Sequence, residues 1–299
     1  MTAEDRERAK GGDLAALDTE SARALDRVLE EFGYLSESDN DLSVPRWTDE
    51  PTIPLKLALA TSGETVASQR GMWEAPTRKL AKRRQVAAAH ERLREEVGAT
   101  WTHGYGLFRP RFLELGRRLV GNGSIAAPDD VFYLTHDEAV MALSSPRDLS
   151  AGVRTVRAEM ESVGDLVMPE MIVGDDWIPE STDVAEVLSG VGASRGRYRG
   201  VARFVERLSE SDELADGEVL LVEYSDVAWT PLFSKAGAVV TAAGGMLAHS
   251  SIVAREMGIP CVASVANARA LDGAKVLVDG FTGEVHVEAW PAAKLTAPA

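Results

Sequence analysis

The chain has 299 residues, 45% of them hydrophobic, which is enough for two domains with packed cores. Asp and Glu outnumber Lys and Arg by 47 to 32, and the net charge of −15 opposes binding to nucleic acid or to anionic membranes. We find no signal peptide and no apolar stretch of about 20 residues, so we expect a cytoplasmic protein. The single cysteine, Cys261, excludes an internal disulfide, and its apolar surroundings predict a core residue rather than a reactive thiol.

The first part of the chain is predicted to be mostly helical. Apolar residues recur at helical spacing over residues 13–32, and Gly33 predicts the end of that helix. An irregular connector follows, "YLSESDNDLSVPRWTDEPTIP". Two longer helices are predicted over residues 76–97, whose charges are typical of a solvated face, and over residues 102–120, where Pro110 predicts a kink or a later start.

The next segment leads to a domain boundary. "VFYL" predicts a short extended segment, and "THDEAVMAL" then begins with Thr135 and Glu138 at the spacing of a capping box, which predicts the start of a helix. A further helix is predicted over residues 154–163, and the polar "GDDWIPESTD" indicates a junction. We therefore place a boundary near residues 180–190, after a mostly helical region over residues 1–185.

The sequence pattern changes over residues 186–291, which predict short strands and short helices and contain frequent glycine. The strands "EVLLVEY" and "AVVTA" precede a helix over about residues 250–257, and "PCVASV" forms the next strand. "AKVLVDGFTGEVHVE" predicts a closing hairpin because its valines alternate on both sides of a turn. This alternation predicts a compact α/β domain, followed by a tail over residues 292–299.

Several motifs that resemble metal-binding or ligand-binding sequences are better explained by structural roles. "HERLRE" begins like a zinc-protease helix, but Arg94 occupies the place of the second histidine ligand, which favours a solvated helix face. The glycines of "GVGASRG" are spaced too widely for a dinucleotide fingerprint. Arg195, Arg197 and Arg199 alternate as on one face of a strand, which indicates a phosphate contact or, as the favoured interpretation, a charged strand edge that opposes aggregation. We predict no metal site in this chain.

The segment "GGMLAHSSIVAREMGIPCV" places His249 at the predicted start of a helix. Taken alone, such a histidine is more often a packing or capping residue than a catalyst. Here Gly244 and Gly245 allow a steep turn out of the preceding strand and the close approach of another molecule. Ser250 and Ser251 add hydroxyls and first-turn amides, which together with the helix dipole favour a bound anion. The segment is therefore suited to a phosphate and to a phosphorylated histidine.

This segment resembles the signature of the mobile phosphohistidine domain of phosphoenolpyruvate-utilising enzymes. The resemblance implies that His249 carries a phosphoryl group and that residues 186–291 form a swivelling β/β/α domain. "GASRGRYRGVARFV", "WTPLF" and "VDGFTGEVHV" are similar to other parts of that domain, and the upstream helical segments look more weakly like rifampin phosphotransferase-like members, in which the histidine domain comes last. The residues expected to support the phosphate are Gly244, Gly245, Ser250, Ser251 and Arg255.

The resemblance also implies a partner. Members of the family phosphorylate the histidine with an ATP-grasp domain, for which this sequence has neither the length nor the pattern. We therefore expect a carrier subunit of a phosphotransferase, which binds no cofactor itself. A separate ATP-grasp protein with ATP and magnesium would phosphorylate His249, which would pass the group to a small-molecule acceptor. The alternative is a non-catalytic regulatory or remnant module that retains the phosphohistidine fold.

Overall fold

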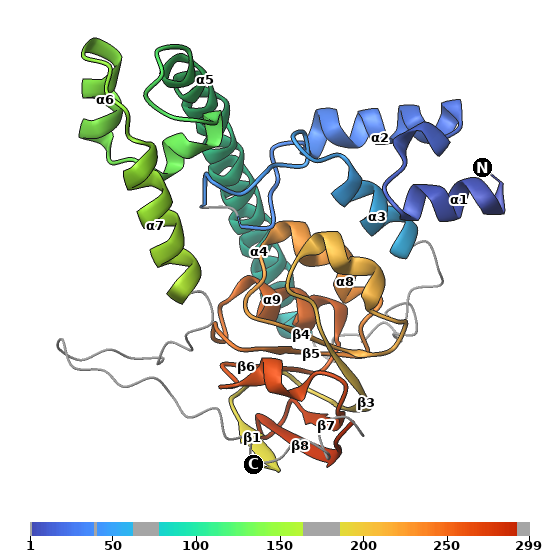
Figure 1. The fold of residues 1–299 in the computed structure, drawn as a ribbon. Coiled ribbons are helices and arrows are strands. Elements are labelled where there is room, and N and C mark those ends of the chain that lie inside the picture. Colours follow the sequence, from blue (N-terminus) through green and yellow to red (C-terminus); the bar gives the residue numbers. More distant parts are fainter. Residues whose placement is uncertain (1, 39–40, 62–77, 164–185, 292–299) are drawn as a thin grey trace, which may run out of the picture. The chain divides into compact units, whose positions relative to one another are not determined.

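A computed structural model describes residues 2–38, 41–61, 78–163 and 186–291 (Figure 1). The chain forms two compact units. Unit 1 consists of Met1–Gly33, Trp47–Met72 and Val167–Ala299, and unit 2 of Tyr34–Arg46 and Trp73–Leu166. The N-terminal helices therefore group with the C-terminal sheet, which the sequence did not indicate. The boundary predicted near residues 180–190 stays a prediction, because residues 164–185 lie outside the described residues.

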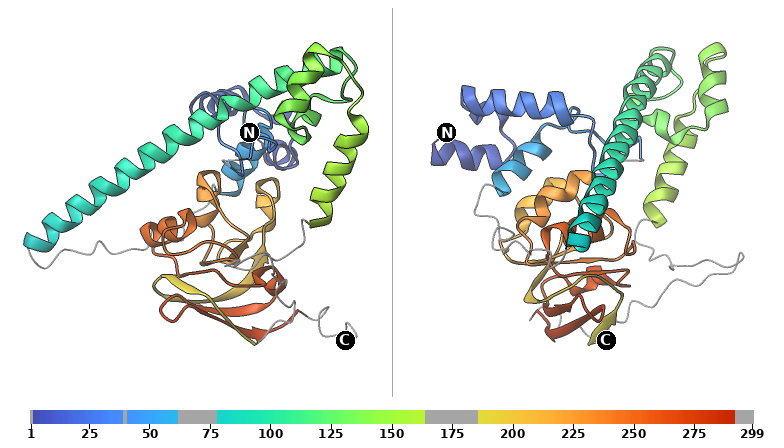
Figure 2. Two further views of the ribbon diagram at one scale, coloured as in Figure 1. Left: turned by 90° about the vertical axis from the view of Figure 1, so that its left-hand side faces the viewer. Right: turned by 180° about the vertical axis from the view of Figure 1, so that it is seen from behind.

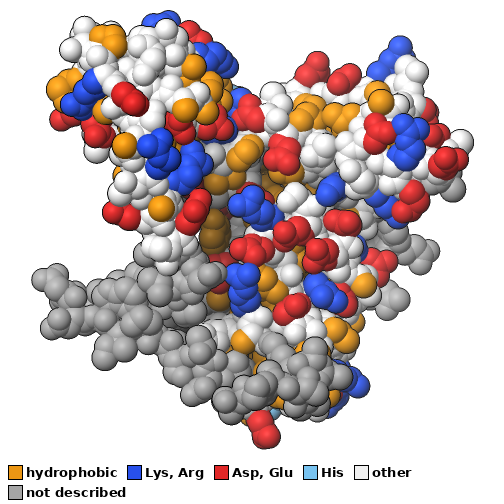
Figure 3. All heavy atoms as spheres, in the orientation of Figure 1, with side chains coloured by type: hydrophobic (Ala, Val, Ile, Leu, Met, Phe, Trp, Pro, Cys, Tyr) orange, Lys and Arg blue, Asp and Glu red, His pale blue; other side chains and the backbone are white. Residues whose placement is uncertain are grey.

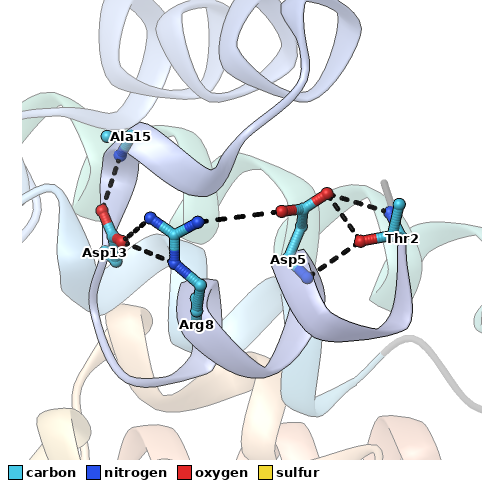
Figure 4. Close-up of polar contacts among 5 residues, drawn as sticks. All are labelled: Thr2, Asp5, Arg8, Asp13 and Ala15. Atoms are coloured by element: carbon cyan, nitrogen blue, oxygen red, sulfur yellow. Dashed lines mark hydrogen bonds and ion pairs between the residues drawn. The ribbon is translucent and has the colours of Figure 1, made fainter.

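The first helix of unit 1, α1 (Ala3–Lys10), is stabilised by local polar contacts (Figure 4). Thr2 and Asp5 form a reciprocal capping box at its start, which satisfies backbone amides that have no partner within the helix. Arg8 in the last turn pairs with Asp13 at 2.6 Å, and Asp13 in turn caps the 3-10 turn that follows. These contacts suit a helix whose sequence is almost entirely polar.

The second helix, α2 (Thr19–Phe32), begins later than predicted. The apolar pattern predicted one helix over residues 13–32, whereas Asp18 caps α2 by accepting a hydrogen bond from a first-turn amide. Gly33 ends the helix, as predicted.

The third helix, α3 (Thr52–Ala60), was not predicted, and it connects the N-terminal helices to the sheet. Leu55 packs in a small core with residues of α1. On the other side, Lys56 donates a hydrogen bond of 2.8 Å to the carbonyl of Ser209, which lies in a 3-10 helix of the sheet part.

Unit 2 contains four α-helices in its described part: α4 (Arg78–Gly106), α5 (Phe108–Gly121), α6 (His136–Ser144) and α7 (Ser150–Val163). The helix predicted over residues 76–97 extends to Gly106, and the next helix starts at Phe108. Pro110 therefore lies in the first turn of α5, where a missing amide costs little, and the later start is confirmed. The capping box of Thr135 and Glu138 is also confirmed at the start of α6.

The extended segment predicted at "VFYL" is wrong, because most of it belongs to a 3-10 helix over Pro128–Tyr133. The Asp130 carboxylate accepts hydrogen bonds from the amides of Ala126 and Ala127 and closes this turn, while Arg157 of α7 pairs with the same carboxylate at 3.0 Å. Val131 then points into the core of unit 2. A local side-chain contact thus outweighs the β-propensity of the segment.

One surface of unit 2 exposes apolar side chains. Val140, Met141 and Leu143 of α6 are all exposed, and Figure 3 shows hydrophobic side chains on the surface at this end of the unit. Elsewhere on the same face of the molecule, basic and acidic side chains are interspersed (Figure 3). No described helix is long and apolar enough to cross a membrane.

The sheet of unit 1 has eight strands in the order β1-β8-β7-β3-β4-β5-β6-β2 (Figures 1 and 2). The central strands β3 to β6 are parallel, and the others pair in antiparallel fashion. The strands are β1 (Val187–Ser189), β2 (Val191–Ser194), β3 (Arg197–Phe204), β4 (Val219–Val222), β5 (Ala238–Thr241), β6 (Cys261–Ala263), β7 (Lys275–Asp279) and β8 (Glu284–Ala289).

Strand β3 lies inside the sheet, so the predicted charged edge is wrong. It pairs with β4 on one side and with β7 on the other. Arg197 and Arg199 instead form ion pairs with Asp279 at 2.7 Å and with Glu288 at 2.6 Å, both of which lie on the neighbouring hairpin. Arg195 lies in the turn before β3.

The buried residues of β4 and β5 come from near-continuous apolar runs, as expected for parallel strands covered on both faces. Two helices, α8 (Thr230–Phe233) and α9 (His249–Met257), contact each other, and α9 packs on β2, β5 and β6 (Figures 1 and 2). The predicted fold class, a helical region followed by a C-terminal α/β sheet domain, is confirmed.

Candidate functional site

The segment from Ala243 to Ala248 forms a loop at the carboxyl ends of the parallel strands, between β5 and α9. The Ala243 amide donates to the carbonyl of Glu223 at 2.8 Å, which continues the pairing of β5 with β4 beyond the end of the strand. Ligands of parallel α/β sheets bind at this edge, where loops and helix N-termini converge. The loop therefore occupies the part of the sheet best suited to a binding or reacting group.

Gly244 and Gly245 serve the loop in different ways. Gly244 has a φ of +107°, in the left-handed region that side chains rarely adopt, and a Cβ there would lie 2.9 Å from the Cβ of Ala248. A Cβ at Gly245 would meet no atom within 4 Å. The first glycine is thus needed for the turn, and the second leaves open space beside the backbone, as the sequence predicted.

Side chains from outside the loop hold its backbone in place. Each carbonyl oxygen of residues 243–246 accepts a hydrogen bond from a side chain. The donors are, in order, Thr241 at 2.8 Å, Ser264, Ser251 at 2.7 Å and Arg255 at 2.7 Å. Because four successive carbonyls have fixed partners, the loop has one orientation before any ligand arrives.

His249 is the first residue of α9 and is half-buried. Its Nε2 lies 3.1 Å from the hydroxyl of Thr230, at the start of α8. In the tautomer with the proton on Nδ1, that hydroxyl donates to Nε2. The residue before the helix, Ala248, offers no side-chain cap, so the first-turn amides of α9 are not capped by a side chain at that position. The site combines an oriented imidazole with a helix N-terminus, which attracts anions.

The other residues predicted to support a phosphate lie close by, but their side chains make contacts within the protein. Ser250 and Ser251 are buried, and the Ser251 hydroxyl donates to the loop as described. Arg255 donates to the carbonyl of Met246 and, at 2.9 Å, to that of Ala193. Direct contact of these side chains with a phosphate stays a prediction; in the structure Ser251 and Arg255 fix the loop.

Sequence reasoning missed three residues of this site, Thr230, Thr241 and Ser264. Thr230 belongs to "WTPLF", which carried a resemblance but no assigned role, Thr241 ends β5 and Ser264 follows β6. Thr230 meets His249, and Ser264 meets the loop, only through the sheet topology.

Cys261 lies in β6 with no exposed surface, and burial raises the pKa of its thiol to about 12. The predicted core role is confirmed. Within the described part of the chain, no group of three His, Cys, Asp or Glu side chains could hold a metal ion.

Comparison with known proteins agrees with the predicted resemblance. Residues 214–283 match the family "PEP-utilising enzyme, mobile domain". An uncharacterised protein of Mycobacterium tuberculosis is 36% identical over 86% of this chain and 30% of its own length. A rifampicin phosphotransferase of Bacillus cereus is 26% identical over 88% of this chain and 34% of its own length. The prodigiosin synthesizing transferase PigC of Serratia marcescens is 29% identical over 86% of this chain and 32% of its own length.

This chain spans about a third of the length of these relatives. The matched segment contains both α8 and the loop that leads to His249. The sheet domain of this chain therefore contains a mobile domain of the phosphoenolpyruvate-utilising enzyme family.

Proposed function

We propose that this chain is a phosphoryl carrier. His249 accepts a phosphoryl group on Nε2 from an ATP-grasp partner and delivers it to a small-molecule acceptor. The observation that carries the proposal is the geometry at the start of α9, where Nε2 is oriented by Thr230 beside a helix N-terminus without a side-chain cap. Two of the named relatives are transferases, which supports a transfer reaction.

The transfer needs the neutral imidazole with its lone pair on Nε2. That lone pair forms a bond to the phosphorus of the donor, and the bond from phosphorus to the leaving oxygen breaks, with its electron pair going to the leaving group. Delivery reverses these roles, since the acceptor oxygen attacks phosphorus and Nε2 leaves with the electron pair. Each half-reaction replaces one bond to phosphorus by another, and a hydroxyl acceptor releases its proton to solvent during delivery, so no oxidant, reductant or further group donor is required.

The surrounding backbone stabilises the transferred group. The first-turn amides of α9 and its helix dipole favour the negative charge of a phosphoryl group bound to His249. Because Thr230 lies 3.1 Å from Nε2, its hydroxyl can donate to a phosphoryl oxygen once Nε2 is bonded to phosphorus. ATP and magnesium act on the partner, where the metal accompanies the nucleotide phosphates.

Labelling with two donors tests this function. Phosphoramidate phosphorylates accessible histidines without a partner, and an ATP-grasp protein of the same organism is supplied with ATP labelled on the β or γ phosphorus. We expect the ATP-grasp protein to give an acid-labile, alkali-stable label on the wild-type chain and none on His249→Ala. Phosphoramidate also reacts with other exposed histidines, such as His136, so we expect peptide mapping to find its label on His249 in the wild type and not at position 249 in the variant. His286→Ala is the matched control, because His286 is also half-buried in unit 1 but lies on β8.

Equal labelling of the His249→Ala chain would refute the assignment. Absence of label on the wild type with both donors would favour the alternative, a regulatory or remnant module that retains the fold.

A further inference from the structure

Two exposed apolar side chains lie in the loop that leads to His249. Leu247 is 86% exposed and Met246 is 55% exposed, although both lie in a loop whose backbone is fixed. Single exposed apolar side chains are ordinary on protein surfaces, whereas adjacent ones can mark an interaction site. Here the carbonyl of Met246 is held by Arg255, and that of Gly245 by Ser251 and by the amide of Ala248. The loop therefore presents both side chains to the solvent in one arrangement.

This position has a geometric consequence for transfer to His249. The reacting nitrogen and phosphorus must approach to about 3–3.5 Å. Leu247 lies two residues before the histidine, so their Cα atoms are at most about 7.6 Å apart, the span of two peptide units. A protein that brings a phosphoryl group to Nε2 therefore approaches the surface around Leu247, whereas a small phosphoryl donor does not need to.

The chemistry of the covered surface is also specific. Between Lys235 and Arg255 the sequence contains no Asp, Glu, Lys or Arg, although 26% of the whole chain is charged. An uncharged rim around the histidine avoids repulsion of an anionic phosphoryl group and favours an apolar counterpart on the donor.

On the basis of the proposed function, we propose that Met246 and Leu247 form the anchor by which the ATP-binding phosphoryl donor docks on this chain. The mouth of the donor's nucleotide site then has an apolar rim that receives Leu247. Preorganised anchors of this kind favour binding, because little side-chain and loop ordering is needed on association.

The test compares the two donors used above on Leu247→Ser. Because Leu247 is largely exposed, this change leaves the core intact. We expect phosphoramidate to label His249 in the variant at the wild-type rate, whereas the concentration of ATP-grasp protein that gives half-maximal labelling rises about tenfold. Phe281→Ser is the matched control. Phe281 is 61% exposed and follows Gly280, which lies against Ser194 and Cys261. Cys261 begins β6, so Phe281 lies at the end of the strand away from the His249 loop. We therefore expect Phe281→Ser to be labelled by both donors as the wild type is.

Four results would overturn this inference. If Leu247→Ser needs the same half-maximal concentration of ATP-grasp protein as the wild type, the donor docks elsewhere. The proposed function is not affected by that result, because the wild-type chain is still labelled. Equally slowed labelling by phosphoramidate would show that Leu247 acts on the histidine itself. A defect confined to transfer from the phosphorylated chain to an acceptor would assign the surface to the acceptor. Failure of the wild type with both donors would refute the proposed function and this inference together.

Discussion

The hydroxyl of Thr230 should control the reactivity of His249, and replacing Thr230 by valine tests this. Valine has nearly the shape of threonine and removes only the group that lies 3.1 Å from Nε2. Without it, the imidazole loses a partner that helps to orient the ring and that can donate to an unprotonated Nε2. The variant should therefore hold a smaller fraction of its histidine in the reactive arrangement.

The size of the effect follows from the kind of bond that is lost. A hydrogen bond of ordinary length contributes about 1 kcal/mol net, and a barrier raised by that amount slows a reaction about fivefold. The effect should be larger if the hydroxyl also donates to the phosphoryl group in the transition state, since hydrogen bonds to charged groups are stronger.

The assay measures the rate at which phosphoramidate phosphorylates His249 in the wild type, Thr230→Val and Thr230→Ser. The ¹⁵N chemical shifts of the imidazole report the tautomer in the same samples. We expect Thr230→Val to be about fivefold slower with a mixed tautomer population, and Thr230→Ser to retain the wild-type tautomer and most of the rate. Denaturant unfolding checks that all three are equally stable. Wild-type rates and tautomer ratios in Thr230→Val would refute the reasoning.

Three further predictions concern the fold. Cys261 should resist thiol reagents in the native protein and react only on unfolding, because burial raises the pKa of its thiol to about 12; fast native alkylation would contradict this. Thr135→Ala should lower the free energy of unfolding of unit 2 by about 1 kcal/mol in denaturant titrations, since α6 loses its capping box. The pKa of Asp279 lies below its ordinary value of 3.8, because hydrogen bonds from Phe281, Arg197 and Thr282 outweigh the effect of burial. This contribution to stability is complete above pH 3.8 and is lost as the pH falls through the lowered pKa, so the stability deficit of Asp279→Asn at pH 7 should shrink in acid; a constant deficit would refute it.

Much of the sheet domain was predictable because its signals are local. The strands β4 and β5, the closing hairpin and the helix after the glycines all follow from short patterns of apolar and turn residues. The 3-10 helix over Pro128–Tyr133 was missed because Asp130 closes it through contacts that propensity does not reveal. The position of α1 to α3 beside the sheet was missed for a different reason, since packing between distant segments leaves no periodic trace.

The candidate site also contains residues that a local sequence pattern identifies and residues that it does not. His249 and the two glycines stand together in one segment and could be identified from it. The partners that orient the histidine and fix the loop cannot, because Thr230 and Ser264 come from other elements that meet the loop only when β4, β5 and β6 pair. The sequence predicted the candidate reacting group, His249, whereas the positioning of its side chain depends on the tertiary structure.

The pairing of β1 with β8 has a consequence for the architecture of larger proteins. Val187 lies opposite His286, and the amide of Val287 donates to the carbonyl of Glu186 at 2.8 Å, so the polypeptide enters and leaves the sheet domain at one place. A domain whose two ends lie side by side can be inserted into another chain, or joined end to end and reopened in an exposed turn, without breaking its strand pairing. The neighbouring ends of the sheet domain thus allow gene fusion to insert it into proteins of different length.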